Sequence, residues 1–166
     1  MTDADVAVAR LNALPRDEAI GRLTACCASS RWAQRTADAR PFSTRAELLR
    51  TADAIWAALR PDDWLEAFRG HPEIGARGTA GWSAQEQAKI RDATADVTER
   101  LAAGNRRYRE RFGYVFIVCA TGRSGVEMLD LLEARLHNAP AEELKIAAEE
   151  QRKITALRID KMLETL

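Results

Sequence analysis

The amino-acid sequence predicts an all-α protein: a compact single-domain bundle of about seven to nine helices with one short irregular or extended buried segment. Two observations carry this prediction. Alanine and leucine recur at helical spacing, and runs of β-branched residues are almost absent. The exception is the apolar run 114–119, which fits either a buried extended stretch or the core of a helix. No repeat, low-complexity tract or linker interrupts residues 1–166, so we expect one domain.

Local signals predict where individual helices begin and end. They place helices at about 17–29, from Ser43 or Thr44 to Leu59, at 61–70, 83–103 and 124–137, and from Pro140 nearly to the C-terminus. Capping boxes (Ser83 with Glu86, Ser124 with Glu127) begin two of them. The run 149–153 mixes both charges and is interpreted as a solvated helix face.

Composition limits the classes of partner and the compartment. Twenty-five basic side chains balance 25 acidic ones, so nothing favours a nucleic acid or an acidic membrane surface. No apolar run is long enough to span a membrane, and we find no signal peptide. The three cysteines, with Cys26 and Cys27 adjacent, do not form a disulfide framework. Free thiols in a reducing compartment, the cytoplasm, are the simpler expectation.

Two charged residues are predicted to lie on apolar helix faces. Glu86 falls one turn before Ile90, on the face that continues through Val97. Arg158 falls within the inward stripe of the last helix, which consists of Leu144, Ala147, Ile154 and Met162. Glu86 either completes a capping box or faces a pocket. Arg158 either reaches the surface, pairs with a structural carboxylate or binds an anionic ligand, since a buried guanidinium needs a negative partner.

His71 lies in an irregular turn between Gly70 and Gly75, because Pro72 disfavours helical geometry for the residue before it. The imidazole is either solvated or presented to a cavity as an acid or base. No pair of histidines has metal-ligand spacing, and no glycine-rich phosphate loop follows a strand, so we expect neither a metal nor a nucleotide cofactor. Cys119 is interpreted as a small core residue, and the loop 122–125 as either an anion site or a simple cap.

Short motifs spread along nearly the whole chain resemble those of one family, the 2-oxo-4-hydroxy-4-carboxy-5-ureidoimidazoline (OHCU) decarboxylases. The motifs are 11–14 (LNAL), 26–29 (CCAS), 31–33 (RWA), 40–42 (RPF), 63–68 (DWLEAF), 71–75 (HPEIG), 82–83 (WS), 86–87 (EQ), 112–120 (FGYVFIVCA) and 153–158 (KITALR). Each motif alone is weak, but their common order is specific. The connection 76–81 departs from the pattern, because it is short where many relatives carry a longer insert.

The resemblance implies an all-helical enzyme without metal or organic cofactor. It implies conversion of OHCU, a small anionic ureidoimidazoline, to (S)-allantoin and CO2, the last step from urate to allantoin. His71 would be the proton donor, with Glu86 as the second catalytic residue. The implied substrate-binding residues are Pro72, Ser83, Ala84, Gln85, Glu86, Gln87, Phe116, Ile117, Val118, Cys119, Ala120 and Arg158. The resemblance also suggests a homodimer, which the residues themselves do not indicate.

Two other functions stay open at this point. A non-catalytic helical binding or scaffold module could share the family's core, but such a module would be favoured only if His71 or Glu86 were replaced. A decarboxylase of a related ureido acid could keep the same acid/base set and differ around the connection 76–81.

Overall fold

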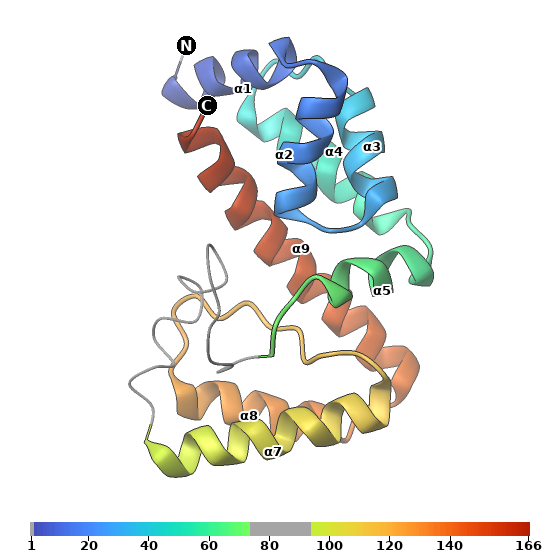
Figure 1. The fold of residues 1–166 in the computed structure, drawn as a ribbon, viewed down its shortest axis with the longest axis vertical. Coiled ribbons are helices and arrows are strands. Elements are labelled where there is room, and N and C mark those ends of the chain that lie inside the picture. The colour runs from blue at the N-terminus through green and yellow to red at the C-terminus, as the bar shows by residue number, and fades with distance from the viewer. Residues whose placement is uncertain (1, 74–93) are drawn as a thin grey trace. The chain divides into compact units, whose positions relative to one another are not determined.

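The computed structural model describes residues 2–73 and 94–166, and this part of the chain contains eight helices and no strand. In chain order (Figure 1) they are α1 (Asp3–Ala13), α2 (Arg16–Cys26), α3 (Ser30–Asp38), α4 (Arg45–Ala57), α5 (Pro61–Arg69), α7 (Ala95–Phe112), α8 (Gly125–Arg135) and α9 (Pro140–Glu164). The predicted all-α class is confirmed.

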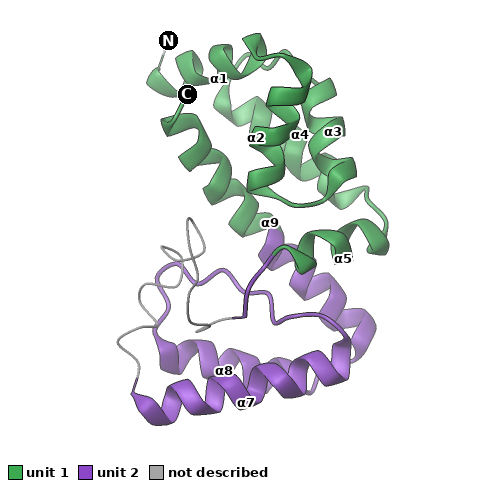
Figure 2. Ribbon diagram, viewed as in Figure 1, with its two compact units in different colours: residues 1–70, 152–166 green, residues 71–151 purple. Residues whose placement is uncertain are grey.

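The chain divides into two compact units (Figure 2). One comprises Met1–Gly70 and Arg152–Leu166, and the other His71–Gln151. Helix α9 therefore contributes 140–151 to the second unit and 152–164 to the first. The single domain expected over residues 1–166 stays a prediction.

Four predicted helix boundaries are confirmed, each by a local physical cause. The Thr44 hydroxyl accepts a hydrogen bond from the Glu47 amide at the start of α4, 3.1 Å away. Pro61 occupies the first turn of α5, where its missing N–H costs nothing. The Ser124 hydroxyl caps α8 by accepting from the Glu127 amide at 3.2 Å. Pro140 begins α9, which continues to Glu164.

Two other predicted boundaries were wrong. The helix expected at 17–29 ends at Cys26, because the Ser29 side chain caps a new helix, α3, by accepting from the Trp32 amide. The helix expected at 83–103 is not continuous, because Thr94 has extended backbone and caps α7. Helix α7 also continues to Phe112 and ends where Gly113 adopts a φ of 85°. The Ser83 capping box lies outside the described residues.

The first unit packs α1 to α5 around a core of fully buried side chains. Helix α3 contacts α2, α4 and α5, so it lies at the centre of this unit. Its Trp32 is fully buried, and the indole N–H donates to the Ala52 carbonyl of α4 at 3.1 Å. A buried indole thus adds apolar area to the core without leaving its one donor unpaired.

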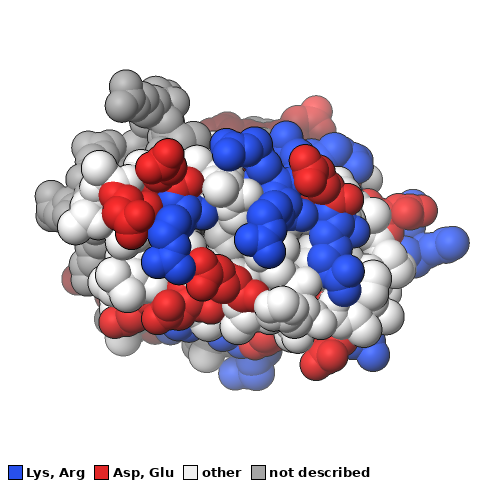
Figure 3. Space-filling view, turned by 90° about the horizontal axis from the view of Figure 1, so that it is seen from below, with Lys and Arg blue, Asp and Glu red and all other residues white. Residues whose placement is uncertain are grey.

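The second unit is built on the contact between α7 and α8. Gly104 of α7 lies so close to Leu132 of α8 that an added Cβ would come within 2.6 Å of the leucine Cδ2. Outside this contact the two helices are joined by an exposed ion pair, with Arg100 Nη2 and Glu133 Oε1 separated by 2.8 Å. On the face seen in Figure 3, basic and acidic side chains lie beside one another.

Gly104→Ala is expected to lower the free energy of unfolding by about 1–2 kcal/mol. Overpacking against the fully buried Leu132 costs about 1–3 kcal/mol and outweighs the helix-propensity gain of about 1 kcal/mol. Gly21→Ala is the matched control, because that exposed glycine of α2 has nothing within 4 Å of an added Cβ. The control should gain about 0.5–1 kcal/mol in urea unfolding. A stabilised Gly104→Ala protein would contradict the close packing.

Candidate active site

His71 lies at the start of the second unit, in the non-helical stretch that precedes Pro72. Its side chain is half-buried, and its Nε2 atom is 2.5 Å from Oε1 of Gln151, a fully buried residue of α9. The imidazole is therefore held by a hydrogen bond and is not merely solvated. A histidine with one fixed ring nitrogen and a half-exposed side chain can act as an acid or base.

The apolar run after α7 is buried, and it is not part of a helix. Residues 115–120 have no regular secondary structure, yet Phe116 and Ile117 are at most 2% exposed. The ring of Tyr108 contacts that of Phe116 edge-on, with centroids 5.4 Å apart. A buried segment outside helices must find partners for its backbone groups elsewhere.

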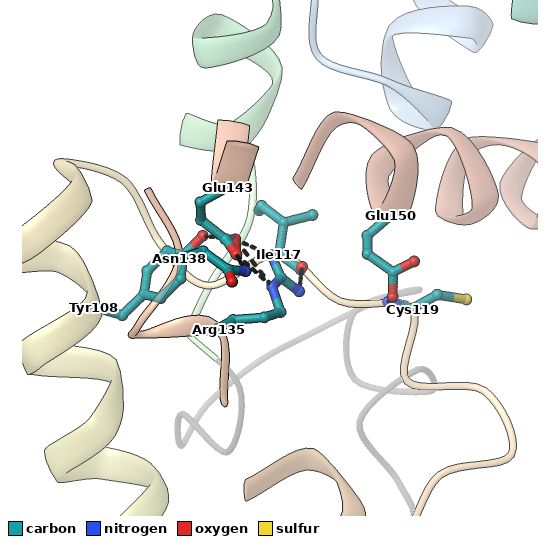
Figure 4. Close-up of polar contacts among 7 residues, drawn as sticks. All are labelled: Tyr108, Ile117, Cys119, Arg135, Asn138, Glu143 and Glu150. Atoms are coloured by element: carbon teal, nitrogen blue, oxygen red, sulfur yellow. Dashed lines mark hydrogen bonds and ion pairs between the residues drawn. The ribbon is translucent and has the colours of Figure 1, made fainter. Parts of the chain in front are cut away.

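Side chains from α8 and α9 supply partners to this backbone (Figure 4). Arg135 Nη1 donates to the Ile117 carbonyl at 2.7 Å, and the Cys119 amide donates to Glu150 Oε1 at 3.3 Å. Arg123 Nε donates to the Cys119 carbonyl at 3.2 Å. The two charged residues of α8 and α9 therefore help to fix the path of the segment 116–120.

Arg135 and Glu143 form a buried ion pair, with side chains only 8% and 0% exposed. Nε and Nη2 of Arg135 lie 2.9 and 2.7 Å from Glu143 Oε2. The Tyr108 hydroxyl donates to the same carboxylate at 2.7 Å, and the Asn138 amide donates to its other oxygen at 3.2 Å (Figure 4). Burial, together with the hydrogen bond to Glu143, raises the pKa of Tyr108 well above its usual range.

In the first unit, Arg158 of α9 is 8% exposed, so the predicted inward orientation of this residue is confirmed. Ala147, Ile154 and Met162 of the same stripe are buried, whereas Leu144 is half-buried.

The three cysteines are free thiols, as predicted. Burial raises the pKa of Cys26 to about 12 and that of Cys27 to about 11, and the positive charge of Arg158 opposes both shifts. These two thiols are therefore neutral core groups and not nucleophiles.

The residues in 2–73 and 94–166 include no group of three or more His, Cys, Asp or Glu side chains that could hold a metal ion. In the same part of the chain, no helix combines the length and apolar character needed to cross a membrane.

The family model described as OHCU decarboxylase matches residues 12–160 of the chain. The chain belongs to the OHCU decarboxylase family.

Curated relatives and solved structures agree with this assignment. The chain is 40% identical over 146 residues to the uric acid degradation bifunctional protein TTL of Arabidopsis thaliana, covering 82% of the chain and 45% of that protein. It thus spans less than half of that relative. It is 30% identical to the OHCU decarboxylase of Amia calva, over 75% of each chain. A crystal structure of an OHCU decarboxylase in the presence of (S)-allantoin superposes with a TM-score of 0.77 at 39% identity, covering 85% of this chain and 96% of that one.

The residues that the family resemblance singles out lie in different parts of the chain. His71, Pro72 and the segment 116–120 belong to the second unit, and Arg158 belongs to the first. Ser83, Ala84, Gln85, Glu86 and Gln87, together with the connection 76–81, lie outside the described residues. Cys119 is half-buried and so is not the core residue expected from the apolar run. Its amide hydrogen is directed to Glu150.

Two polar residues of α9 that contact His71 and the segment 116–120 are not predicted from the sequence. The predicted solvated face 149–153 is wrong for Glu150 and Gln151, which are 7% and 0% exposed. A signal was present. Glu143 and Glu150 follow the same three- and four-residue spacing that leads through Ala147 and Ile154 to Arg158. Glu150 lies between Ala147 and Ile154 within the predicted inward stripe, and Glu143 lies one turn before Ala147, so helical spacing places both carboxylates on the buried face.

Glu143→Gln is expected to lower the free energy of unfolding by about 3–5 kcal/mol, because it leaves the buried Arg135 guanidinium without its counter-charge. Urea unfolding measures this loss. Asp38→Asn is the matched control, since Asp38 and Arg16 form an ion pair whose side chains are 52% and 55% exposed. The control should unfold nearly like the wild type, because solvent screens exposed pairs. Equal destabilisation by the two substitutions would contradict the special role given to the buried pair.

Proposed function

We propose that this chain decarboxylates OHCU to (S)-allantoin and CO2. The observation that carries the proposal is the 39% identity to an OHCU decarboxylase crystallised in the presence of (S)-allantoin, over 96% of that chain. The retained His71, with its ring held by Gln151, gives the proposed reaction an acid at a defined position. The proposal takes residues 1–166 to act as one decarboxylase domain.

The substrate explains why no electron-accepting cofactor is required in this proposal. In OHCU the carboxylate and a hydroxyl share one ring carbon, next to the unsaturated carbon that carries the ureido group. When the bond to CO2 breaks, its electron pair moves toward that neighbour and gives an enol-type intermediate. The protein must then stabilise the developing negative charge and deliver one proton to one face of the ring.

We assign the proton to His71. As imidazolium it would lie against the departing carboxylate. It would then protonate the ring carbon that carries the ureido group, and this step sets the S configuration. Glu86 would bind the ureido N–H groups or the His71 ring, and Ser83, Ala84, Gln85 and Gln87 would line the same pocket with Pro72. Arg158 would hold the ring or ureido oxygens, since a guanidinium offers two parallel N–H donors.

The segment 116–120 is proposed to line the pocket with backbone groups. A backbone fixed by Arg135 and Glu150 keeps its remaining amides at constant positions, and such prearranged donors stabilise an anionic intermediate without moving.

The proposed compartment is the cytoplasm, which suits three free cysteines. A homodimer is the proposed assembly, and the proposed partners include neither nucleic acid nor membrane.

The direct test is circular dichroism of allantoin made from urate by urate oxidase and hydroxyisourate hydrolase, with and without this protein. Faster formation of the (S)-allantoin signal would support the proposal. A slow, racemic product equal to the blank would overturn it, in favour of a binding module or a decarboxylase of another ureido acid.

His71→Ala is expected to lower kcat by about 10²–10⁴-fold, the usual contribution of a positioned acid or base, with an unchanged helical far-ultraviolet spectrum. His137→Ala, which removes the other histidine of the chain, is the control, because His137 is exposed near the end of α8. Its rate should equal that of the wild type. A near-normal rate in His71→Ala would remove this residue from the mechanism.

Arg158→Lys is expected to raise KM by about tenfold or more, because one ammonium group cannot reproduce a two-point contact with the substrate. Arg45→Lys serves as control, since Arg45 makes a similar two-point contact with Asp160 at 2.6 and 2.7 Å, but at an exposed position. Steady-state kinetics of both variants measure the difference. An unchanged KM in Arg158→Lys would contradict substrate binding by Arg158.

A further inference from the structure

The contact between His71 and Gln151 joins a proposed proton donor to a buried amide. The Nε2 atom of the half-buried imidazole lies 2.5 Å from Oε1 of Gln151, whose side chain is 0% exposed. Gln151 belongs to α9, so its backbone is fixed by the helix on both sides. Neither the sequence motifs nor the family's site residues include this glutamine.

We infer that Gln151 is a positioning residue that keeps a proton on Nε2 of His71, which leaves Nδ1 as the ring nitrogen that exchanges a proton with the substrate. The inference rests on the proposed function for the identity of the substrate, and on the Gln151 contact for the orientation of the ring. Because both ring nitrogens then have partners, Glu86 takes the first of its two proposed roles, which is to bind the ureido N–H groups.

An amide oxygen can only accept a hydrogen bond, so the ring nitrogen that faces it must be a donor. A neutral imidazole carries one N–H, and neutral His71 is therefore the Nε2–H form. The second proton of the imidazolium is then bound at Nδ1. In the reaction that proton leaves Nδ1, whose N–H bonding pair stays on the nitrogen. The proton bonds to the ring carbon that carries the ureido group, through the electron pair that the broken bond to CO2 left as a double bond between the two ring carbons. The pair of the former carbon–nitrogen double bond moves to the ring nitrogen, which takes up the hydroxyl proton as the hydroxyl becomes a carbonyl. His71 returns to neutral Nε2–H, and a proton from water restores the imidazolium.

A glutamine suits this role better than a carboxylate. The amide is uncharged, so it orients the ring without forming an ion pair that would hold the proton more tightly on the imidazolium. Because Gln151 is buried, water does not compete for its oxygen, and the hydrogen bond favours one ring nitrogen over the other. The tautomer is thus fixed before the substrate binds.

Nitrogen-15 NMR of histidine-labelled protein reads the tautomer directly. The chain has two histidines, and His137→Ala leaves only the signals of His71. At a pH where His71 is neutral, the expected spectrum has a protonated Nε2 and an unprotonated Nδ1. A predominant Nδ1–H form, or a mixture of tautomers like that of a free imidazole, would overturn the inference whether or not the Gln151 variants fold.

Substitutions separate positioning from packing. Gln151→Met keeps the length of the side chain but removes the acceptor. It should lower kcat by about 10- to 100-fold, the loss found when the hydrogen-bond partner that orients a metal-bound histidine is removed. KM should stay within about twofold, since the substrate contacts remain. Gln151→Glu keeps an acceptor and should restore the Nε2–H form. Thr155→Val removes another buried polar group of α9 and should leave the His71 spectrum unchanged.

The results distinguish this inference from the proposed function. An active wild-type enzyme whose His71 is the Nδ1–H form would overturn the role of Gln151 alone. An inactive wild-type protein with the Nε2–H form would overturn the proposed function and leave the positioning of the ring in place. A Gln151→Met protein with unchanged kcat would also overturn the role of Gln151.

Discussion

The buried ion pair between Arg135 and Glu143 is the constraint on which the second unit depends. Removing two charges from water costs several kcal/mol for each ion, and only close geometry and further hydrogen bonds offset this. Here the guanidinium also donates to the Ile117 carbonyl, and the carboxylate also accepts from Tyr108 and Asn138. One pair of charges therefore links α7, α8, the start of α9 and the non-helical segment that contains Ile117.

Helix α9 places four charged or amide side chains on its buried face, and successive ones are separated by seven, one and seven residues. Glu143 pairs with Arg135, Glu150 accepts from the Cys119 amide, and Gln151 holds the His71 ring. Arg158 follows Gln151 by seven residues, which is about two turns. The buried polar side chains of α9 therefore bind other parts of the chain in addition to filling the core. In the proposed function, Glu150 holds the backbone that faces the substrate, Gln151 holds the acid, and Arg158 binds the substrate.

Much of this structure could be predicted from the sequence because its causes are local. Thr44, Pro61 and Ser124 begin helices through their own side chains, and the inward position of Arg158 follows from helical spacing. Other features depend on distant residues. Glu150 accepts a hydrogen bond from the amide of Cys119, which lies 31 residues earlier in the chain. The contact of Gln151 with His71 joins positions 80 residues apart, and spacing along one helix does not reveal such a partner.

The charges of α8 and α9 hold the backbone of the segment 116–120 in place. Amide hydrogen exchange in a Glu150→Leu variant tests this, because the substitution removes the acceptor of the Cys119 amide. We expect faster exchange at Cys119 and its neighbours, while the buried amide of Leu101 in α7 keeps its protection. Unchanged protection at Cys119 would contradict the role given to Glu150.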